Sequence, residues 1–275
     1  MILAGVLVAV VIARSGDDGG TSGDSGERGL TGGDFHSLVA DPLIADRLYV
    51  GGHSAVSVSA DGGRSWRPVA SLENADAMGW GFTGGATWVS GHPGLSISTD
   101  GAASFARHND GLPDTDVHAF GTTGETLVAA GPGLGVVSST DGGETWNQLA
   151  SDAGQGFFGR ISAAADDPDH LVAANAAAGP VASSDGGRTW RLLTDFPATW
   201  VSTDERLTTI IASNADGAIR STDGGDTWDA IELPDGASLV EIDPHHADRL
   251  YAGVHVGSSV QVFVSDDDGA SWRAP

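Results

Sequence analysis

The stretch Ser139-Thr-Asp-Gly-Gly-Glu-Thr-Trp146 decides the fold, because five variants of it recur along the chain. Each variant keeps the serine, the central aspartate and an aromatic last residue, and the five span residues 59–66, 98–105, 183–190, 221–228 and 265–272. The six central aspartates are Asp61, Asp100, Asp141, Asp185, Asp223 and Asp267. They are separated by 39, 41, 44, 38 and 44 residues, and such a period indicates repeated structural units.

Four short strand-like segments accompany each eight-residue box. The first repeat has them at residues 35–40, 47–51, 54–59 and 67–70, and the third segment runs directly into the box. Four short strands per repeat, without helical periodicity, are typical of a β-propeller blade. The sequence therefore predicts an all-β fold, a six-bladed β-propeller over residues 34–275 with four-stranded antiparallel blades.

The box itself reads as the turn between the third and fourth strands of a blade. Its aspartate can accept backbone N–H groups within the turn, its glycines can adopt positive φ, and its tryptophan can pack between strands. Ala102 and Asp268 stand where other boxes have one glycine of the pair, so these two turns should be weaker.

This pattern resembles the Asp-box, or bacterial neuraminidase repeat, over residues 34–275. Similar proteins include sialidases, secreted prokaryotic glycosyl hydrolase-like proteins and, more distantly, sortilin-type receptor domains and photosystem II assembly factors. The resemblance implies that the boxes lie at the blade periphery, so all six box aspartates are expected to be structural. Segments 35–38, 78–82, 91–94 and 116–119 resemble a secreted subgroup of these glycosyl hydrolase-like proteins.

Closure of the predicted ring has two solutions. Only three residues follow Trp272, so the sixth blade lacks sequence for a full fourth strand. Either residues 27–33 supply that outer strand, or the sixth blade ends short.

The composition excludes some partners. The formal net charge is −24, with 30 aspartates, 7 glutamates and no lysine, so nucleic acid and anionic membrane surfaces are disfavoured. Such a surface suits solubility or the attraction of cations. Cysteine is absent, which excludes disulfides and thiolate chemistry. We expect a monomer.

The amino terminus suggests export. Residues 1–13 form an apolar run that suits a signal peptide or a membrane anchor, and residues 14–33 read as a flexible Gly/Ser/Asp linker. We therefore expect an extracytoplasmic protein, either secreted or anchored at the outer face of the cytoplasmic membrane. The alternative is that the apolar run forms a buried first strand.

No recognisable catalytic set stands out. Sialidase chemistry needs a tyrosine nucleophile and an arginine cluster, but Tyr49 and Tyr251 occupy the same position of the repeat. Nearly all arginines also recur at or beside repeat positions. An enzyme of this kind would be a glycosidase-like hydrolase but no true sialidase, and a stacking Trp80 or Trp200 would favour it.

Three successive first strands share an Asp-x-(His/Met) pattern, which points to one channel mouth. A tight turn at residues 91–94 could add another histidine there. The predicted ligand-binding residues at this mouth are Asp34, His36, Asp76, Met78, Trp80, His92, Asp116, His118 and Arg160. Of these, His36, His92 and His118, with Met78 or an aspartate, could hold copper or zinc. The alternatives are an organic-ligand site and histidines that only hydrogen-bond neighbouring blades.

The sequence thus favours an exported scaffold that binds a protein, a peptide or a glycan at the propeller face. A glycan-active enzyme and a metal-binding propeller remain alternatives.

Overall fold

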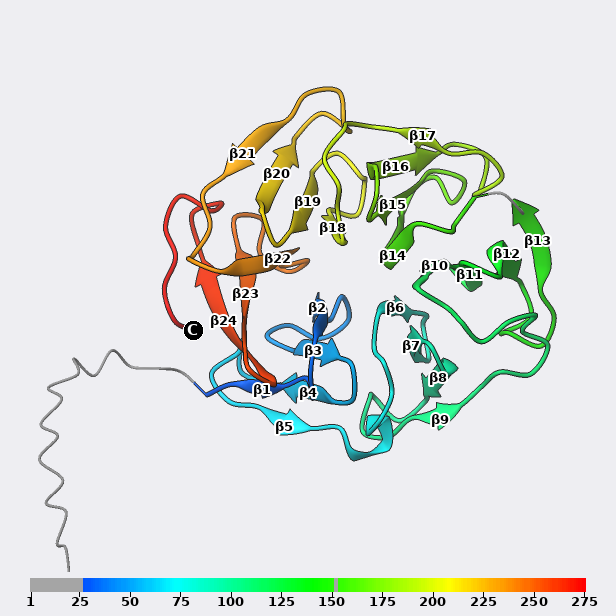
Figure 1. Ribbon diagram of the computed structural model, residues 1–275, viewed down its shortest axis with the longest axis horizontal. Coiled ribbons are helices and arrows are strands. Elements are labelled where there is room, and N and C mark those ends of the chain that lie inside the picture. The colour runs from blue at the N-terminus through cyan, green and yellow to red at the C-terminus, as the bar shows by residue number, and fades with distance from the viewer. Residues whose placement is uncertain (1–26, 151–152) are drawn as a thin grey trace, which may run out of the picture.

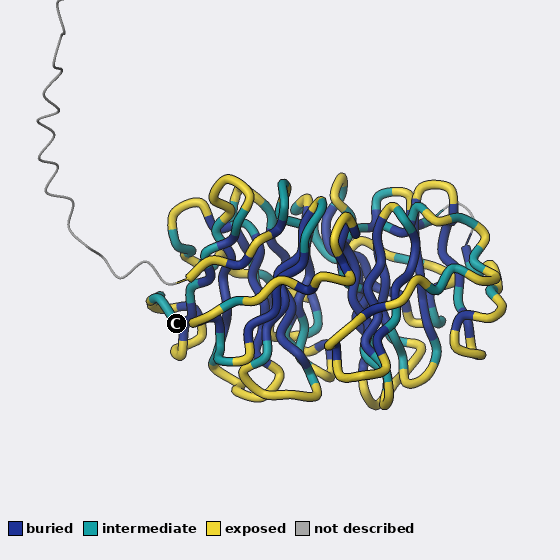
Figure 2. Tube along the Cα trace, turned by 90° about the horizontal axis from the view of Figure 1, so that it is seen from below, coloured by how far each residue is buried: buried dark blue, intermediate teal, exposed yellow. Residues whose placement is uncertain are grey.

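The computed structural model describes residues 27–150 and 153–275. Those residues form β-strands and one 3₁₀ turn, η1 (Ala70–Leu72), without any α-helix. The strands are grouped around a common centre, as the prediction of a propeller-like all-β fold requires (Figure 1). Viewed from the side, the molecule is a thick disc with buried strands inside and exposed loops on both faces (Figure 2).

The strands fall into four classes by distance from the centre. The innermost strands are β2 (Phe35–Ala40), β6 (Gly79–Phe82), β10 (Ala119–Thr123), β14 (Phe157–Ala163), β18 (Trp200–Thr203) and β22 (Ala237–Ile242). Next outward are β3 (Leu48–Gly52), β7 (Thr87–Gly91), β11 (Thr126–Gly131), β15 (Leu171–Asn175), β19 (Ile210–Asn214) and β23 (Leu250–Val256).

The outer half of each sheet is built in the same way. The third strands are β4 (Val56–Ser59), β8 (Gly94–Ser98), β12 (Gly135–Ser139), β16 (Gly179–Ser183), β20 (Gly217–Ser221) and β24 (Ser259–Ser265). The outermost strands are β5 (Arg67–Pro68), β9 (Ala106–Arg107), β13 (Asn147–Ala150), β17 (Arg191–Leu192), β21 (Asp229–Ile231) and β1 (Gly29–Leu30).

Neighbouring strands within each group of four pair antiparallel, as the repeat pattern predicts. Four sheets have four strands each, and the fifth has eight because β10 and β14 pair in parallel and join two groups. The innermost strands of successive groups thus run side by side in the same direction at this joint. The fourth strand of the first repeat ends at Pro68, earlier than predicted, because the chain then turns into η1.

The sheet formed by the last repeat is completed by the amino-terminal segment. Strand β1 pairs with β24 through Gly29 with Val260 and Leu30 with Ser259, so β1 is the outer fourth strand. Of the two solutions considered for closure, the structure therefore has the N-terminal one. The apolar run at residues 1–13 lies outside the described residues. In the described ranges, no helix has the length and apolar character needed to cross a membrane.

The boxes form one recurrent hydrogen-bonded turn. In the third box, Asp141 accepts hydrogen bonds from the Ser139 hydroxyl (2.7 Å) and from the Thr145 amide and hydroxyl (2.9 and 2.6 Å). These bonds lower the pKa of Asp141 to about 2, the Thr145 hydroxyl contributing most. Where glycine is replaced, Ala102 and Asp268 still take φ of 63° and 60°. The turn geometry therefore imposes left-handed backbone on these two residues, and their lower turn stability stays a prediction.

Candidate functional site

The most distinctive group of side chains lies where the innermost strands begin. We call it the histidine rim and define it by His36, His53, Asp76, His92, Asp116 and His118. The residues come from the first three repeats, at or just before the starts of β2, β6 and β10 and in the turns that follow β3 and β7. The structure thus brings together five residues that the sequence singled out, and adds one.

Asp76 is the organising residue of the histidine rim. It is 4% exposed, and its two carboxylate oxygens contact two imidazoles: Oδ1 lies 2.7 Å from His36 Nδ1, and Oδ2 is hydrogen-bonded to His92 Nδ1. Burial by itself would raise the pKa of Asp76, but the hydrogen bonds and charges of His36 and then His92 outweigh it and lower the pKa. An ionised carboxylate can only accept, so both histidines donate through Nδ1. In the neutral form of each ring, Nε2 carries the lone pair and can act as an acceptor or a metal ligand.

The outward nitrogen of His92 faces a second acidic residue and a second histidine. His92 Nε2 lies 3.6 Å from Asp116 Oδ1, and His118 Nε2 lies 2.9 Å from the same oxygen. One ligand atom from each of these residues falls within 4.8 Å of the others. Within the described part of the chain, Asp116 Oδ1 and His118 Nε2 are buried atoms without a well-formed hydrogen bond. The two atoms face each other at 2.9 Å without good hydrogen-bond geometry, and a cation bound between them is one arrangement that would satisfy both.

The spacing of these atoms suits a shared cation. Two donors bound to one ion at about 2.1 Å lie roughly 3.0–3.5 Å apart in tetrahedral or octahedral geometry. The separations of 2.9 and 3.6 Å are close to that range before any adjustment. Two imidazoles and one carboxylate on one side of an ion form a 2-His-1-carboxylate set, which leaves other coordination positions open.

The structure brings together only two of the three histidines that were predicted as metal ligands. His92 and His118 converge with Asp116, whereas the Nδ1 atom of His36 is engaged by Asp76 on the other side of that carboxylate. His36 therefore supports Asp76 and is not one of the three converging residues. Metal-ligating histidines are usually held by a carboxylate on their other ring nitrogen, as Asp76 holds His92.

Two further residues of this region were missed by the sequence analysis. His53 follows β3 directly, and its Nδ1 lies 3.8 Å from Asp76 Oδ2. It occupies the same position after its second strand as His92 does, and that repeat equivalence could have revealed it. Phe158, at the start of β14, packs edge-on against His36 and His118 with ring centroids 5.6 and 6.1 Å away. Nothing in its repeat marks it.

Three other predicted mouth residues are not members of the histidine rim. Asp34 is exposed, and its backbone carbonyl accepts the His53 amide. Met78 is 2% exposed, so its thioether is buried in the core. Trp80 is fully buried, stacks on Tyr49 and donates its indole N–H to the Ser37 hydroxyl at 2.9 Å. These three residues were predicted from the periodicity of the repeat, which does not show where each side chain lies or how deeply it is buried.

Arg160 is also separate from the histidine rim. It lies on β14 beside an irregularity in the pairing with β15, and its side chain reaches the buried Glu241. It lines a cavity together with residues at the far ends of the innermost strands, including Phe82, Thr122 and Thr203.

The aromatic residues that would have favoured glycan chemistry are structural. Trp200 is fully buried and donates to Glu241 at 3.2 Å. The hydroxyls of Tyr49 and Tyr251 donate to Asp41 and Asp243 in equivalent positions. Burial, followed by the charge of the neighbouring aspartate, raises the pKa of both tyrosines. Neither tyrosine is therefore placed as an accessible nucleophile.

Comparison with known proteins places the chain by fold only. No family model matches it, and no curated protein matches it by sequence. Among solved structures, a GH74 xyloglucanase from Xanthomonas campestris matches with a TM-score of 0.60 at 15% identity, over 89% of this chain and 45% of that one. This chain therefore spans less than half of the length of that enzyme.

Smaller proteins match along most of their length. YCF48 from Cyanidioschyzon merolae has a TM-score of 0.51 at 18% identity, over 88% of this chain and 85% of its own. YCF48 bound to D1 peptide matches with a TM-score of 0.53 at 15% identity, over 88% and 82% of the two chains. These likenesses establish a β-propeller architecture shared with glycanase and peptide-binding proteins.

Proposed function

We propose that this chain is an exported six-bladed Asp-box propeller that binds a divalent transition-metal ion at the histidine rim. His92 Nε2, His118 Nε2 and Asp116 Oδ1 would be the protein ligands. The observation that carries the proposal is that His92 Nε2 and His118 Nε2 lie 3.6 and 2.9 Å from Asp116 Oδ1, with His118 Nε2 and Asp116 Oδ1 buried and without a well-formed hydrogen bond. The apolar run at residues 1–13 supports export, and the six recurrent boxes support the blade count and the family of the repeat.

Asp76 and His36 would act as supporting residues. The buried carboxylate fixes the ring of His92 with its Nδ1 donating, so that the Nε2 lone pair faces Asp116 and His118. His36 holds the other carboxylate oxygen at 2.7 Å and restrains Asp76 in turn. A site whose ligands are oriented in advance needs less reorganisation when the ion arrives.

The donor set favours zinc or ferrous iron over copper(I). Imidazole nitrogen with carboxylate oxygen suits Zn²⁺ and non-haem Fe²⁺, whereas a thioether would suit copper(I). The thioether considered for this role, that of Met78, is buried in the core. The formal charge of −24 would also raise the local concentration of cations.

A second candidate function is peptide or protein binding on the propeller face. It is supported by the fold shared with YCF48, which has been solved with a D1 peptide. The two functions are compatible, because an ion with open coordination positions at one rim could also anchor a partner. The GH74 likeness supports only a shared architecture with glycan-active enzymes, since the indoles of Trp80 and Trp200 are buried.

Isothermal titration of the full chain with Zn²⁺ tests the proposal. We expect one site per chain, lost in His118→Ala and weakened in His36→Ala, because one residue is a ligand and the other a support. His246→Ala is the matched control, since His246 also contacts an aspartate, Asp243, at 3.0 Å outside this rim. Equal binding by His118→Ala and the wild type would refute the assignment.

A further inference from the structure

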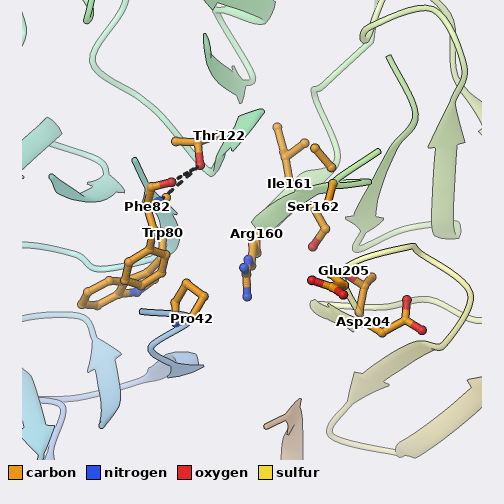
Figure 3. Close-up of a pocket in the computed structure, with 13 residues that line it drawn as sticks. Pro42, Trp80, Phe82, Thr122, Arg160, Ile161, Ser162, Asp204 and Glu205 are labelled. Carbon is orange, nitrogen blue, oxygen red and sulfur yellow. Dashed lines mark hydrogen bonds between the residues drawn. The ribbon is translucent and has the colours of Figure 1, made fainter. Parts of the chain in front are cut away.

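A cavity of about 160 Å³ lies where the innermost strands end, away from the histidine rim. It is lined by the last part of β6, by β10, β14 and β18, and by Pro42 just after β2. In Figure 3, Arg160 stands between Trp80 and Pro42 on one side and Ser162 and Glu205 on the other. We call this space the Arg160 cavity.

Most N–H donors of the Arg160 guanidinium group make no hydrogen bond to the described residues. In the described residues it makes one hydrogen bond, to Glu241 Oε1 at 3.4 Å, although a guanidinium carries five N–H donors. Glu241 is fully buried and also accepts the Trp200 indole N–H and the Ala40 amide. The Glu241 carboxylate is thus shared among several strands, and Arg160 itself lines the Arg160 cavity.

Ser162 supplies an independent sign of a ligand. The residue is 5% exposed and lines the cavity, and its hydroxyl has no hydrogen-bond partner within the ranges that the structure describes. Leaving a buried hydroxyl unpaired is unfavourable, so a polar group in the cavity would satisfy it. Ser162 and Arg160 lie two residues apart on β14 and both line the same space.

The rest of the cavity lining is partly apolar and partly acidic. Phe82, which is partly exposed, gives an apolar wall, whereas Glu205 is exposed and adds a carboxylate on the side opposite Trp80 (Figure 3). Asp204 also lines the cavity, but its two oxygens accept backbone amides of its own turn. Glu205 is therefore the better partner for a positively charged group.

We propose that the Arg160 cavity binds a small α-amino acid. The ligand carboxylate would accept from Arg160 and Ser162, its ammonium group would face Glu205, and a short side chain would lie against the apolar wall. The limited volume, about 160 Å³, suits a small ligand such as glycine or alanine. A planar carboxylate also matches the bidentate geometry that arginine favours.

Titration of the full chain with L-alanine, glycine and acetate, followed by calorimetry, tests this assignment. We expect one site for the amino acids and binding of acetate at least about tenfold weaker, because acetate lacks the ammonium group. Ser162→Ala should weaken L-alanine binding by about tenfold without lowering thermal stability, since its hydroxyl stabilises nothing in the free protein.

The Glu205→Gln variant tests recognition of the ligand's ammonium group independently of its carboxylate. It should weaken L-alanine binding and leave acetate binding unchanged, whereas Glu144→Gln, an exposed carboxylate in a box, should change neither. Absence of L-alanine binding, or binding unaffected by both Ser162→Ala and Glu205→Gln, would overturn the proposal. Acetate binding as tightly as L-alanine would overturn the amino-acid assignment. None of these outcomes depends on the metal site, because its ligands are not altered.

Discussion

At the scale of single residues, Asp76 has more influence than any other side chain of the histidine rim. It is a buried, ionised carboxylate whose two oxygens fix the ring orientations of His36 and His92. A carboxylate accepts from both rings at once, so both present Nε2 outward. The direction of His92, one of the proposed metal ligands, therefore depends on a residue that need not contact the metal.

Replacing Asp76 by asparagine should weaken zinc binding by about 10- to 100-fold. The amide keeps the shape of the side chain but offers one acceptor and one donor group, so one imidazole must change its tautomer. Competition with a chromophoric zinc chelator would measure the affinity, with Asp110→Asn, an exposed carboxylate nearby in sequence, as the control. An unchanged affinity in Asp76→Asn would show that Asp76 does not orient the ligands.

The sequence predicted most of the histidine rim, because the Asp-x-(His/Met) pattern repeats at equivalent positions. The sequence could not predict how deeply each side chain is buried. Met78 and His118 occupy equivalent positions, yet Met78 is buried whereas His118 lines the rim. Arg160 was placed at the same mouth because its strand begins there, but a long side chain beside a strand irregularity reaches Glu241. Side-chain direction at such irregularities follows from packing and not from periodicity.

At the scale of elements, the box turns are held by ionised aspartates. Hydrogen bonds from the threonine four residues later, and then from the serine two residues earlier, lower the pKa of Asp141 and Asp223 to about 2. The ordinary value is 3.8. A carboxyl group with a lowered folded-state pKa stabilises the fold above its ordinary pKa, and that contribution disappears as the pH falls through the folded-state value.

The thermal midpoint should therefore fall steeply as the pH drops from about 4 to about 2. Asp141→Asn should lower the midpoint at neutral pH and flatten this acid dependence, because one of the titrating turns is then missing. Thermal unfolding followed by circular dichroism between those pH values measures both effects. Asp235→Asn is a suitable control in an ordinary loop. If the acid slopes of the Asp141→Asn variant and the wild type coincide, the box aspartates do not stabilise the turns in this way.

The boundaries of the strands were predicted well where the box fixes them. Third strands end at the serine that opens each box, as at Ser59 and Ser139. Fourth strands were predicted less well, because only two to four residues pair there and the following loop decides their length. The end of β5 at Pro68 shows this, since η1 begins two residues later.

At the scale of the whole molecule, closure joins the two ends of the described chain. β1 adds to β24, and the amides of Thr31 and Gly32 donate to the Ser258 carbonyl at 3.0 and 3.2 Å. Gly29 fits closely there, since a Cβ on it would lie 2.4 Å from Val50 Cγ2. The sequence left this closure open because a strand of two residues carries no pattern of its own.

A chain that begins at residue 33 should be less stable than one that begins at residue 27. The shorter chain loses β1 and the hydrogen bonds of residues 29–32, and we expect a loss of about 2–4 kcal/mol in the free energy of unfolding. Urea denaturation of both chains gives the difference, with the chain from residue 27 as the reference. Gly29→Val in the longer chain should destabilise in the same direction. Equal stability of the two chains would mean that β1 contributes nothing to closure.

The metal content of the full chain, loaded with zinc and then desalted, tests the central claim most directly. Mass spectrometry should find about one zinc ion per chain in the wild type and in His246→Ala, and almost none in the double variant Asp116→Ala, His118→Ala. No retained zinc in the wild type, or equal retention in the double variant, would contradict the assignment of the histidine rim as a metal site.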